Sequence, residues 1–167
     1  MNYEFPKGFW WGSAASGPQT EGVFEGDNKG DNIWDHWYRE EPEKFFNQVG
    51  PEKTSYFYEK YKEDIQLMKE TGHTTFRTSI QWSRLIPNGT GEVNQKAVEF
   101  YNDVINELLA NDIEPFINLY HFDMPMKLQE KGGWLDRKTV DAYVVFAKTC
   151  FELFGDRVKK WFTHNEP

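Results

Sequence analysis

The residues best suited to acid–base chemistry lie at the carboxyl end of the sequence. Residues 158–164, VKKWFTH, form an apolar, β-rich segment that is followed by Asn165 and Glu166. A carboxylic acid at the end of a buried strand, beside apolar walls, has a raised pKa and can donate a proton at neutral pH. The neighbouring amide can hydrogen-bond a hydroxyl group of a bound molecule. A Glu-Pro pair is also an ordinary solvated turn after a strand, so this segment alone leaves both interpretations of Glu166 open.

Polar side chains also follow three earlier segments that are rich in strand-forming residues. These segments are residues 8–16, 74–80 and 115–121. The first leads to Gln19 and Glu21, the second to Gln81, Ser83 and Arg84, and the third ends at His121 and leads to Asp123. In a (β/α)8 barrel the site is built at the carboxyl ends of the strands. Four strand ends of this kind therefore indicate a functional site.

Arg77 lies inside the predicted strand TTFRTSI. Strand alternation places Thr75, Arg77 and Ser79 on one face. A guanidinium within a sheet is costly unless a carboxylate pairs with it. Arg77 therefore either forms a structural ion pair or orients a catalytic carboxylate, and the sequence leaves both alternatives open.

His121 is ambiguous by itself, because a single histidine at a strand end is more often packed or exposed than catalytic. His121 and Asp123 have side chains that bind metals, but no third or fourth ligand follows at a useful spacing. We therefore predict no metal site and no cofactor.

Helical patterns fill the gaps between the predicted strands. Residues 54–71, 94–110 and 138–154 each carry apolar side chains at intervals of three and four. Asn94 is placed to cap the second helix, while Gly72 and Gly155 follow the first and third. A long loop rich in Gly, Asn and Asp follows the first strand. The alternation predicts parallel strands with crossover helices in one domain, residues 1–167.

Two α/β architectures fit this alternation, a doubly wound open sheet and part of a (β/α)8 barrel. A doubly wound nucleotide-binding domain needs a glycine-rich phosphate loop between a strand and a helix. GDNKGDN, residues 26–32, has neither the spacing nor the position of such a loop. The sequence therefore favours the barrel.

The composition narrows the possible partners. The chain has 167 residues, a net charge of −8 and one cysteine, Cys150. The negative charge argues against nucleic-acid binding, and no apolar run approaches the roughly 20 residues of a membrane span. Without a predicted disulfide or a signal peptide, we expect a cytoplasmic protein that binds neither nucleic acid nor membrane. Aromatic residues make up 17% of the chain, which fits a large core and also the platforms on which sugar rings stack.

Five motifs, in order, closely resemble the amino-terminal part of glycoside hydrolase family 1, the β-glucosidase and 6-phospho-β-glucosidase family. They are FWWGSAASGPQTEG (9–22), FRTSIQWSRLIP (76–87), NLYHFDMP (118–125), GGWLDR (132–137) and WFTHNEP (161–167). The resemblance covers essentially the whole chain. It implies a (β/α)8 barrel and retaining hydrolysis of β-glycosides.

The resemblance also implies roles for individual residues. Glu166 matches the general acid/base of the Asn-Glu-Pro motif, and Asn165 matches the residue that contacts the sugar 2-hydroxyl. Gln19 and His121 match positions that hydrogen-bond the sugar in the cleaving subsite. Arg77 matches the arginine that neighbours the nucleophile.

Two residues depart from the common family pattern. Phe122 takes the place of the tryptophan in the family's usual His-Trp-Asp, and His164 takes a position where an apolar residue is more common. The Phe variant, with GPEKTSYFYEKYKEDI (50–65), is more similar to the phospho-β-glucosidase branch. The residues that bind the phosphate lie late in family members, outside this sequence.

Retaining hydrolysis needs a second carboxylate, the nucleophile. The family carries it in a Glu-Asn-Gly motif that does not occur here. A complete barrel typically takes about 250 residues. We therefore expect an amino-terminal half-barrel of about four βα units that is inactive alone. The alternative is a non-catalytic domain that binds sugar weakly or self-associates through its open strand edges, two copies closing a pseudo-barrel.

Overall fold

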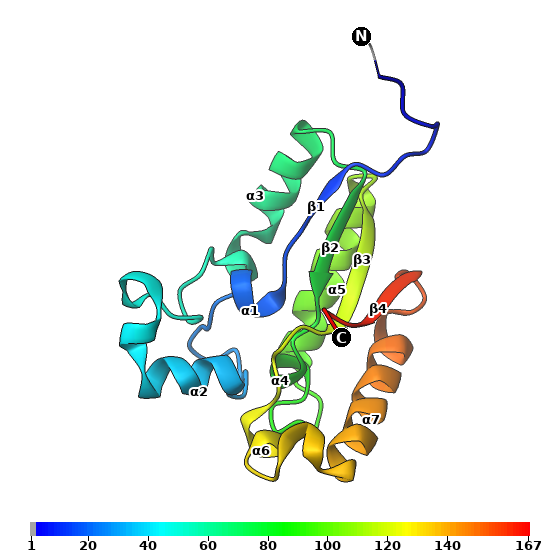
Figure 1. Ribbon diagram of the computed structural model, residues 1–167. Helices are drawn as coiled ribbons and strands as arrows, with labels where there is room; N and C mark the ends of the chain where they lie inside the picture. The colour runs from blue at the N-terminus through cyan, green and yellow to red at the C-terminus, as the bar shows by residue number, and fades with distance from the viewer. Residues whose placement is uncertain (1–2) are drawn as a thin grey trace.

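The computed structural model describes residues 3–167, and its centre is a parallel four-stranded sheet (Figure 1). The strands are β1 (Gly12–Ala14), β2 (Thr75–Ser79), β3 (Glu114–Tyr120) and β4 (Lys160–His164). They lie in the order β1-β2-β3-β4. A doubly wound sheet reverses its strand order at a switch point, whereas a (β/α)8 barrel adds strands in sequence. The predicted fold, four successive βα units of a barrel, is confirmed.

Three long helices connect the strands, as the sequence predicted. They are α3 (Phe57–Glu70), α5 (Gln95–Ala110) and α7 (Arg137–Phe154). The Asn94 side chain accepts a hydrogen bond from the backbone of Lys96, so the predicted cap of α5 is confirmed. Gly72 follows α3 with a φ of +82°, which glycine adopts without strain.

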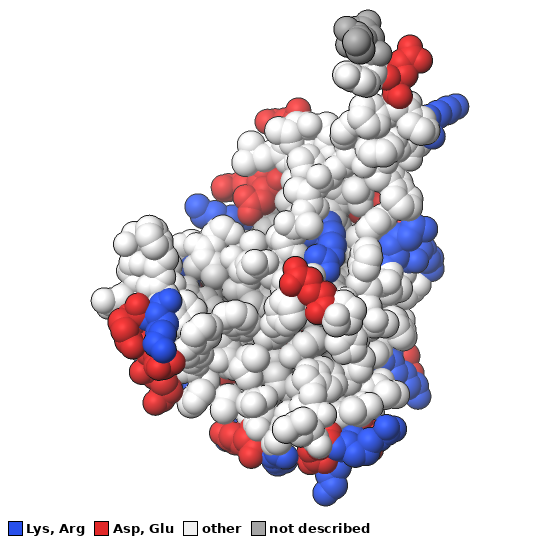
Figure 2. Space-filling model, in the orientation of Figure 1, with Lys and Arg blue, Asp and Glu red and all other residues white. Residues whose placement is uncertain are grey.

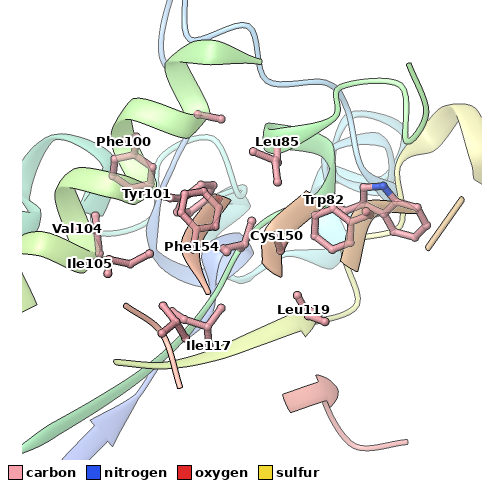
Figure 3. Close-up of a cluster of buried hydrophobic side chains, with 14 of the residues drawn as sticks. Trp82, Leu85, Phe100, Tyr101, Val104, Ile105, Ile117, Leu119, Cys150 and Phe154 are labelled. Atoms are coloured by element: carbon pink, nitrogen blue, oxygen red, sulfur yellow. The ribbon is translucent and has the colours of Figure 1, made fainter. Parts of the chain in front are cut away.

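The core lies between the sheet and these helices (Figure 3). The Trp82 ring stacks on Phe146 of α7 with their centroids 5.2 Å apart. Ile117 of β3 and Cys150 of α7 are buried in the same cluster. Phe76 points from β2 toward Phe57 of α3. The helix-facing side of the sheet is therefore the packed side.

The opposite face of the sheet is less covered. Phe162 of β4 is 41% exposed and Trp10 is 50% exposed. In the middle of the face drawn in Figure 2, a small group of acidic and basic side chains stands among uncharged ones. Among residues 3–167, β1 pairs only with β2 and β4 only with β3. Both edges of the sheet therefore lack a further strand in the described chain.

Several short elements differ from the expected loops and strand lengths. The predicted first strand, residues 8–16, is regular only at Gly12–Ala14. The long loop after it contains α1 (Gly17–Thr20), α2 (Ile33–Glu40), η1 (Pro42–Lys44) and η2 (Phe46–Gln48). Later connections contain α4 (Trp82–Leu85), α6 (Met126–Gln129) and η3 (Gly133–Leu135). No helix in the described residues is long and apolar enough to cross a bilayer.

A buried ionic network ties the loop after β1 to α4. Arg84 is fully buried, and its Nε donates to Glu21 Oε2 at 2.7 Å and its Nη1 to Asp27 Oδ2 at 2.7 Å. The Gln81 amide also donates to Glu21, and the Arg84 guanidinium lies 4.5 Å from the centre of the Tyr58 ring. The network fastens the chain segment that carries α1 against the end of β2.

Arg84→Met is expected to lower the free energy of unfolding by about 3–5 kcal/mol, because two buried carboxylates lose their partner. Denaturant unfolding of the protein that carries this chain measures the loss. Arg39→Met is the matched control, since the Arg39–Asp31 pair is also short but 51% exposed on each side. That control is expected to cost under about 1 kcal/mol. Equal losses in the two variants would contradict the account.

Candidate active site

A cavity of about 680 Å³ opens at the carboxyl ends of the strands. The carboxyl terminus of the chain and α1 gather at this end of the sheet (Figure 1). Five residues singled out from the sequence line the cavity: Gln19, Arg77, His121, Asn165 and Glu166. Arg77 lies in β2 and the other four follow β1, β3 or β4, so the fold brings together residues that are up to 147 positions apart (166 − 19).

Arg77 contacts the residue before Glu166. Its Nη2 donates to Asn165 Oδ1 at 2.8 Å, and its guanidinium lies 5.2 Å from the centre of the Phe162 ring. In the part of the chain that the structure describes, no carboxylate forms an ion pair with Arg77. Arg77 therefore forms no structural ion pair in the described chain. The other alternative, that Arg77 orients a catalytic carboxylate, stays a prediction.

Glu166 lines the cavity but is exposed to solvent. The sequence led us to expect a carboxyl enclosed by apolar walls, but within residues 3–167 the Glu166 side chain is exposed and not enclosed. The reason is the position of β4, which within residues 3–167 has a neighbouring strand on one side only. The Phe162 side chain of β4, whose ring lies beside the Arg77 guanidinium, is itself 41% exposed.

Two cavity residues have uncommon backbone conformations. Phe122 has a φ of +60° and Glu166 a φ of +45°. Residues other than glycine are rarely found in this left-handed region, which costs about 1–3 kcal/mol and is often used at functional sites. The turns after β3 and β4 therefore hold their side chains in positions that an unstrained strand end would not provide.

His121 is half-buried beside charged groups of both signs. Burial lowers the pKa of its imidazole, and the Arg77 guanidinium lowers it further, while the Glu166 carboxylate opposes them. The imidazole is therefore neutral at pH 7. A neutral ring both donates and accepts hydrogen bonds, which suits it to a hydroxyl group.

Asp123 fixes the loop that carries His121. Its Oδ1 accepts from the backbone of His121 at 3.0 Å and its Oδ2 from the backbone of Trp82 at 2.8 Å. Asp123 does not line the cavity and is fully buried. Burial raises its pKa from 3.8 to about 6. Its expected place at a strand end is confirmed, and its contacts are those of a loop anchor.

The stability of the protein is expected to fall as pH rises through the Asp123 titration. Between pH 3.8 and about 6 the folded state holds this proton and the unfolded state does not, so each rise in pH favours unfolding. Asp123→Asn removes this dependence. We compare the free energies of unfolding of the wild-type protein and of Asp123→Asn. The value for the wild type, relative to the variant, should fall by on the order of 2–3 kcal/mol between pH 3.8 and about 6 and stay constant above pH 6. A difference that is independent of pH would contradict the assignment.

Gln19 is positioned by α1, which lies close against the end of β2. The Ser16 hydroxyl donates to Gln19 Oε1 at 2.7 Å, and the Gly17 backbone donates to Ser79 Oγ at 2.8 Å. A Cβ at Gly17 would lie 2.3 Å from Gln81 Cγ, so only glycine permits this approach. The Gln19 carbonyl oxygen is occupied, which leaves its NH₂ group to donate into the cavity.

Other polar residues at the strand ends do not line the cavity. Glu21, Gln81, Ser83 and Arg84 are buried behind it. The sequence placed them correctly near the end of the sheet, but Glu21, Gln81 and Arg84 use their polar atoms on one another. They support the site and do not face a ligand.

One wall of the cavity was missed in the sequence. It is apolar and consists of Trp34, Phe45, Val49, Pro51 and Phe122. The segment before α2 is tied to the loop after β3, because Ile33 N donates to Met124 O at 3.0 Å and Met126 N donates to Asp31 O at 2.8 Å. Phe122 stood out in the sequence as a departure from the family pattern, and for the other four residues the high aromatic content was the general signal.

The cavity therefore has a polar end with hydrogen-bonding groups and a carboxylate, and an apolar wall beside it. Such a combination suits a molecule with several hydroxyl groups and an apolar face. Within residues 3–167, no group of three or more His, Cys, Asp or Glu side chains is arranged to hold a metal ion.

Comparison with known proteins identifies relatives over nearly the whole chain. The model of the family described as Glycosyl hydrolase family 1 matches residues 1–167. The chain is 68% identical over 165 residues to "6-phospho-beta-glucosidase GmuD" of Bacillus subtilis (strain 168), a match that covers 99% of this chain and 36% of that protein. It is 48% identical over 164 residues to "Beta-glucosidase 34" of Oryza sativa subsp. japonica, covering 98% of this chain and 32% of that protein.

Solved structures give the same result. "Family 1 b-glucosidase from Thermotoga maritima" superposes with a TM-score of 0.93 at 42% identity, covering 98% of this chain and 36% of that one. A rice β-glucosidase, Os3BGlu6, superposes with a TM-score of 0.91 at 44% identity, covering 95% of this chain and 33% of that one. The chain spans about a third of the length of these relatives.

Proposed function

Because the chain belongs to glycosyl hydrolase family 1, we propose that the protein it comes from hydrolyses β-glucosides with retention of configuration. The observation that carries the proposal is the single cavity in which Glu166 lies with Gln19, Arg77, His121 and Asn165. In this proposal Glu166 protonates the glycosidic oxygen as the bond to the sugar breaks. It then takes a proton from the water that releases the sugar.

The polar residues around Glu166 bind and orient the sugar. Asn165 hydrogen-bonds the sugar 2-hydroxyl, and Gln19 and His121 hydrogen-bond its other hydroxyl groups. Arg77 holds Asn165 at 2.8 Å, and its positive charge has no carboxylate partner among the described residues. We propose that it stands beside the nucleophilic carboxylate and orients it.

The nucleophile completes the pair of carboxylates that retaining hydrolysis requires, which lie about 5–5.5 Å apart. Among the described residues that line the cavity, Glu166 is the only one with a carboxylate side chain. We therefore propose that residues 1–167 are inactive alone. Turnover by the isolated chain that disappears in Glu166→Gln would contradict this part of the proposal.

We propose 6-phospho-β-glucosides as the substrates. Support comes from the higher identity to the Bacillus 6-phospho-β-glucosidase than to the rice β-glucosidase, 68% against 48%. Phe122, in place of the family's usual tryptophan, lines the cavity and also favours this branch. The test compares kcat/KM of the full-length protein for an aryl β-glucoside and for its 6-phosphate. A preference for the phosphorylated substrate is expected, and a preference for the unphosphorylated one would overturn the assignment.

A second candidate is a non-catalytic half-barrel domain that binds sugar weakly or self-associates. The observation in its favour is the pair of sheet edges, β1 and β4, that have no outer neighbour in residues 3–167. Exposed aromatic side chains such as Trp10 and Phe162 add apolar surface next to them. Sedimentation of the isolated chain tests this candidate, and a monodisperse monomer would count against self-association.

A further inference from the structure

Asn118 is a buried polar residue to which the proposed function assigns no role. It lies in β3 opposite Phe162 of β4 and is fully buried. Its Nδ2 donates to the carbonyl oxygen of Tyr120 at 3.0 Å and lies 3.4 Å from Nδ1 of His121. Among residues 3–167 its Oδ1 has no hydrogen-bond partner.

The Tyr120 carbonyl fixes the orientation of the Asn118 amide. A carbonyl oxygen only accepts hydrogen bonds, so the NH₂ group of Asn118 must face it. Rotating the amide by half a turn would bring two acceptor oxygens together and leave a buried NH₂ group unpaired, which is costly. The observed orientation leaves one acceptor unpaired instead. It also leaves the second hydrogen of Nδ2 available to the His121 ring.

This arrangement decides which nitrogen of His121 carries the proton. A neutral imidazole has one nitrogen that donates and one that accepts. Because Asn118 presents a donor to Nδ1, Nδ1 must accept, and the proton must be on Nε2. We infer that Asn118 is a positioning residue that holds His121 in the Nε2–H tautomer, so that the ring offers a hydrogen-bond donor to an oxygen of the substrate. The meaning of this donor for catalysis rests on the proposed function, whereas the tautomer itself does not.

The same amide shares a hydrogen-bond acceptor with the segment that leads to Glu166. The Tyr120 carbonyl oxygen accepts from Asn118 Nδ2 and from the backbone of Asn165 at 2.9 Å. Asn118 is therefore next to the His121 ring and is linked to the Asn165 peptide through the Tyr120 carbonyl oxygen. The charged groups that face the ring are Arg77 from β2 and Glu166 after β4, and burial with the Arg77 charge lowers the pKa of His121. The ring is therefore neutral at pH 7, where the choice of tautomer matters.

The direct test is a ¹⁵N NMR spectrum of the full-length protein labelled at histidine and measured above the His121 pKa. A nitrogen that carries a proton and one that does not resonate far apart, so the spectrum reports the tautomer. His121→Gln assigns the signals. We expect Nδ1 without a proton and Nε2 with one. A wild-type spectrum with the proton on Nδ1 would overturn the inference without any variant of Asn118.

Variants of Asn118 provide the second test. Asn118→Leu removes the donor, and the His121 signals should move toward a mixture of the two tautomers. Asn118→Asp replaces the donor with an acceptor and should shift the proton to Nδ1. Asn94→Asp is the control, because Asn94 is another buried asparagine whose amide bonds Asp27 O and Arg84 O, away from the cavity. It should leave the His121 signals unchanged. Unchanged His121 signals in both Asn118 variants would contradict the inference.

The kinetic consequence separates this inference from the proposed function. On a 6-phospho-β-glucoside, Asn118→Leu should lower kcat/KM on the order of tenfold, the size expected for one lost hydrogen bond. If the wild-type protein shows the predicted tautomer but hydrolyses no β-glucoside, the proposed function fails and the inference stands. If the protein hydrolyses the β-glucoside but carries the His121 proton on Nδ1, the inference fails and the proposed function stands.

Discussion

Glu166→Gln in the full-length protein is expected to lower kcat/KM about 10²–10⁴-fold for a substrate with an alkyl or sugar leaving group, the usual contribution of a positioned general acid. The amide keeps the size of the side chain and removes its proton. Because the side chain is exposed at the cavity rim, the fold should tolerate the change. Hydrolysis rates measured beside an unfolding curve separate loss of chemistry from loss of structure.

Glu130→Gln is the matched control for that variant. Glu130 is also exposed, and its carboxylate pairs with Lys127 at the surface. Both side chains of this pair are at least 50% exposed. Its replacement should leave kcat/KM unchanged within error. If Glu166→Gln retains wild-type activity, the assignment of the proton donor is wrong.

Arg77→Met is the second variant with a large expected effect, a loss in kcat/KM on the order of 10²-fold or more. It removes the hydrogen bond that holds Asn165 beside Glu166. It also removes the positive charge that we propose orients the nucleophilic carboxylate. In the proposed mechanism the charge stabilises the reacting carboxylate, so the effect should lie mostly in kcat.

The same variant has a readout that does not depend on activity. The Arg77 charge lowers the pKa of His121, and the Glu166 charge raises it. Removing Arg77 should therefore raise the His121 pKa, which the NMR titration of its ring measures. Arg39→Met, which removes an arginine outside the cavity, should leave it unchanged. A His121 pKa that does not rise in Arg77→Met would contradict the proximity of the two charges.

The long elements of the fold could be predicted because their signals are local. Helix α5 has an apolar stripe and an Asn94 cap within one stretch of sequence, and both are present in the structure. Strands β2 to β4 agree with the predicted segments within about two residues at each end, which is the usual precision of such boundaries. The alternation of strands and helices predicted parallel strands, and the absence of a phosphate loop favoured the barrel, in which strands are added in sequence order.

Helix α2 was missed although its start had a recognisable pattern. Asn32 and Asp35 form a capping box, in which each side chain accepts from the backbone of the other. The glycines and asparagines just before it are typical of a loop, and they outweighed this pattern in the prediction. The apolar wall that α2 helps to form was missed for the same reason.

The burial of the polar residues could not be predicted from single strand ends. Arg84 and Glu21 lie 63 residues apart in sequence and pair only because the end of β2 meets the loop after β1. The solvent exposure of Glu166 likewise depends on what lies beyond β4, which no local pattern encodes. The polar residue types at the strand ends indicated where the cavity lies. Which of these residues face it depends on contacts between segments that are far apart in the sequence.

The central claim, that Glu166 protonates the leaving group, is tested most directly with a series of aryl 6-phospho-β-glucosides whose leaving groups differ in acidity. A good leaving group departs without a proton, whereas a poor one needs the acid. For wild-type protein the logarithm of kcat/KM should depend weakly on the leaving-group pKa. For Glu166→Gln the dependence should be much steeper, with nearly wild-type rates for the most acidic leaving group. Parallel lines for the two proteins would contradict the claim.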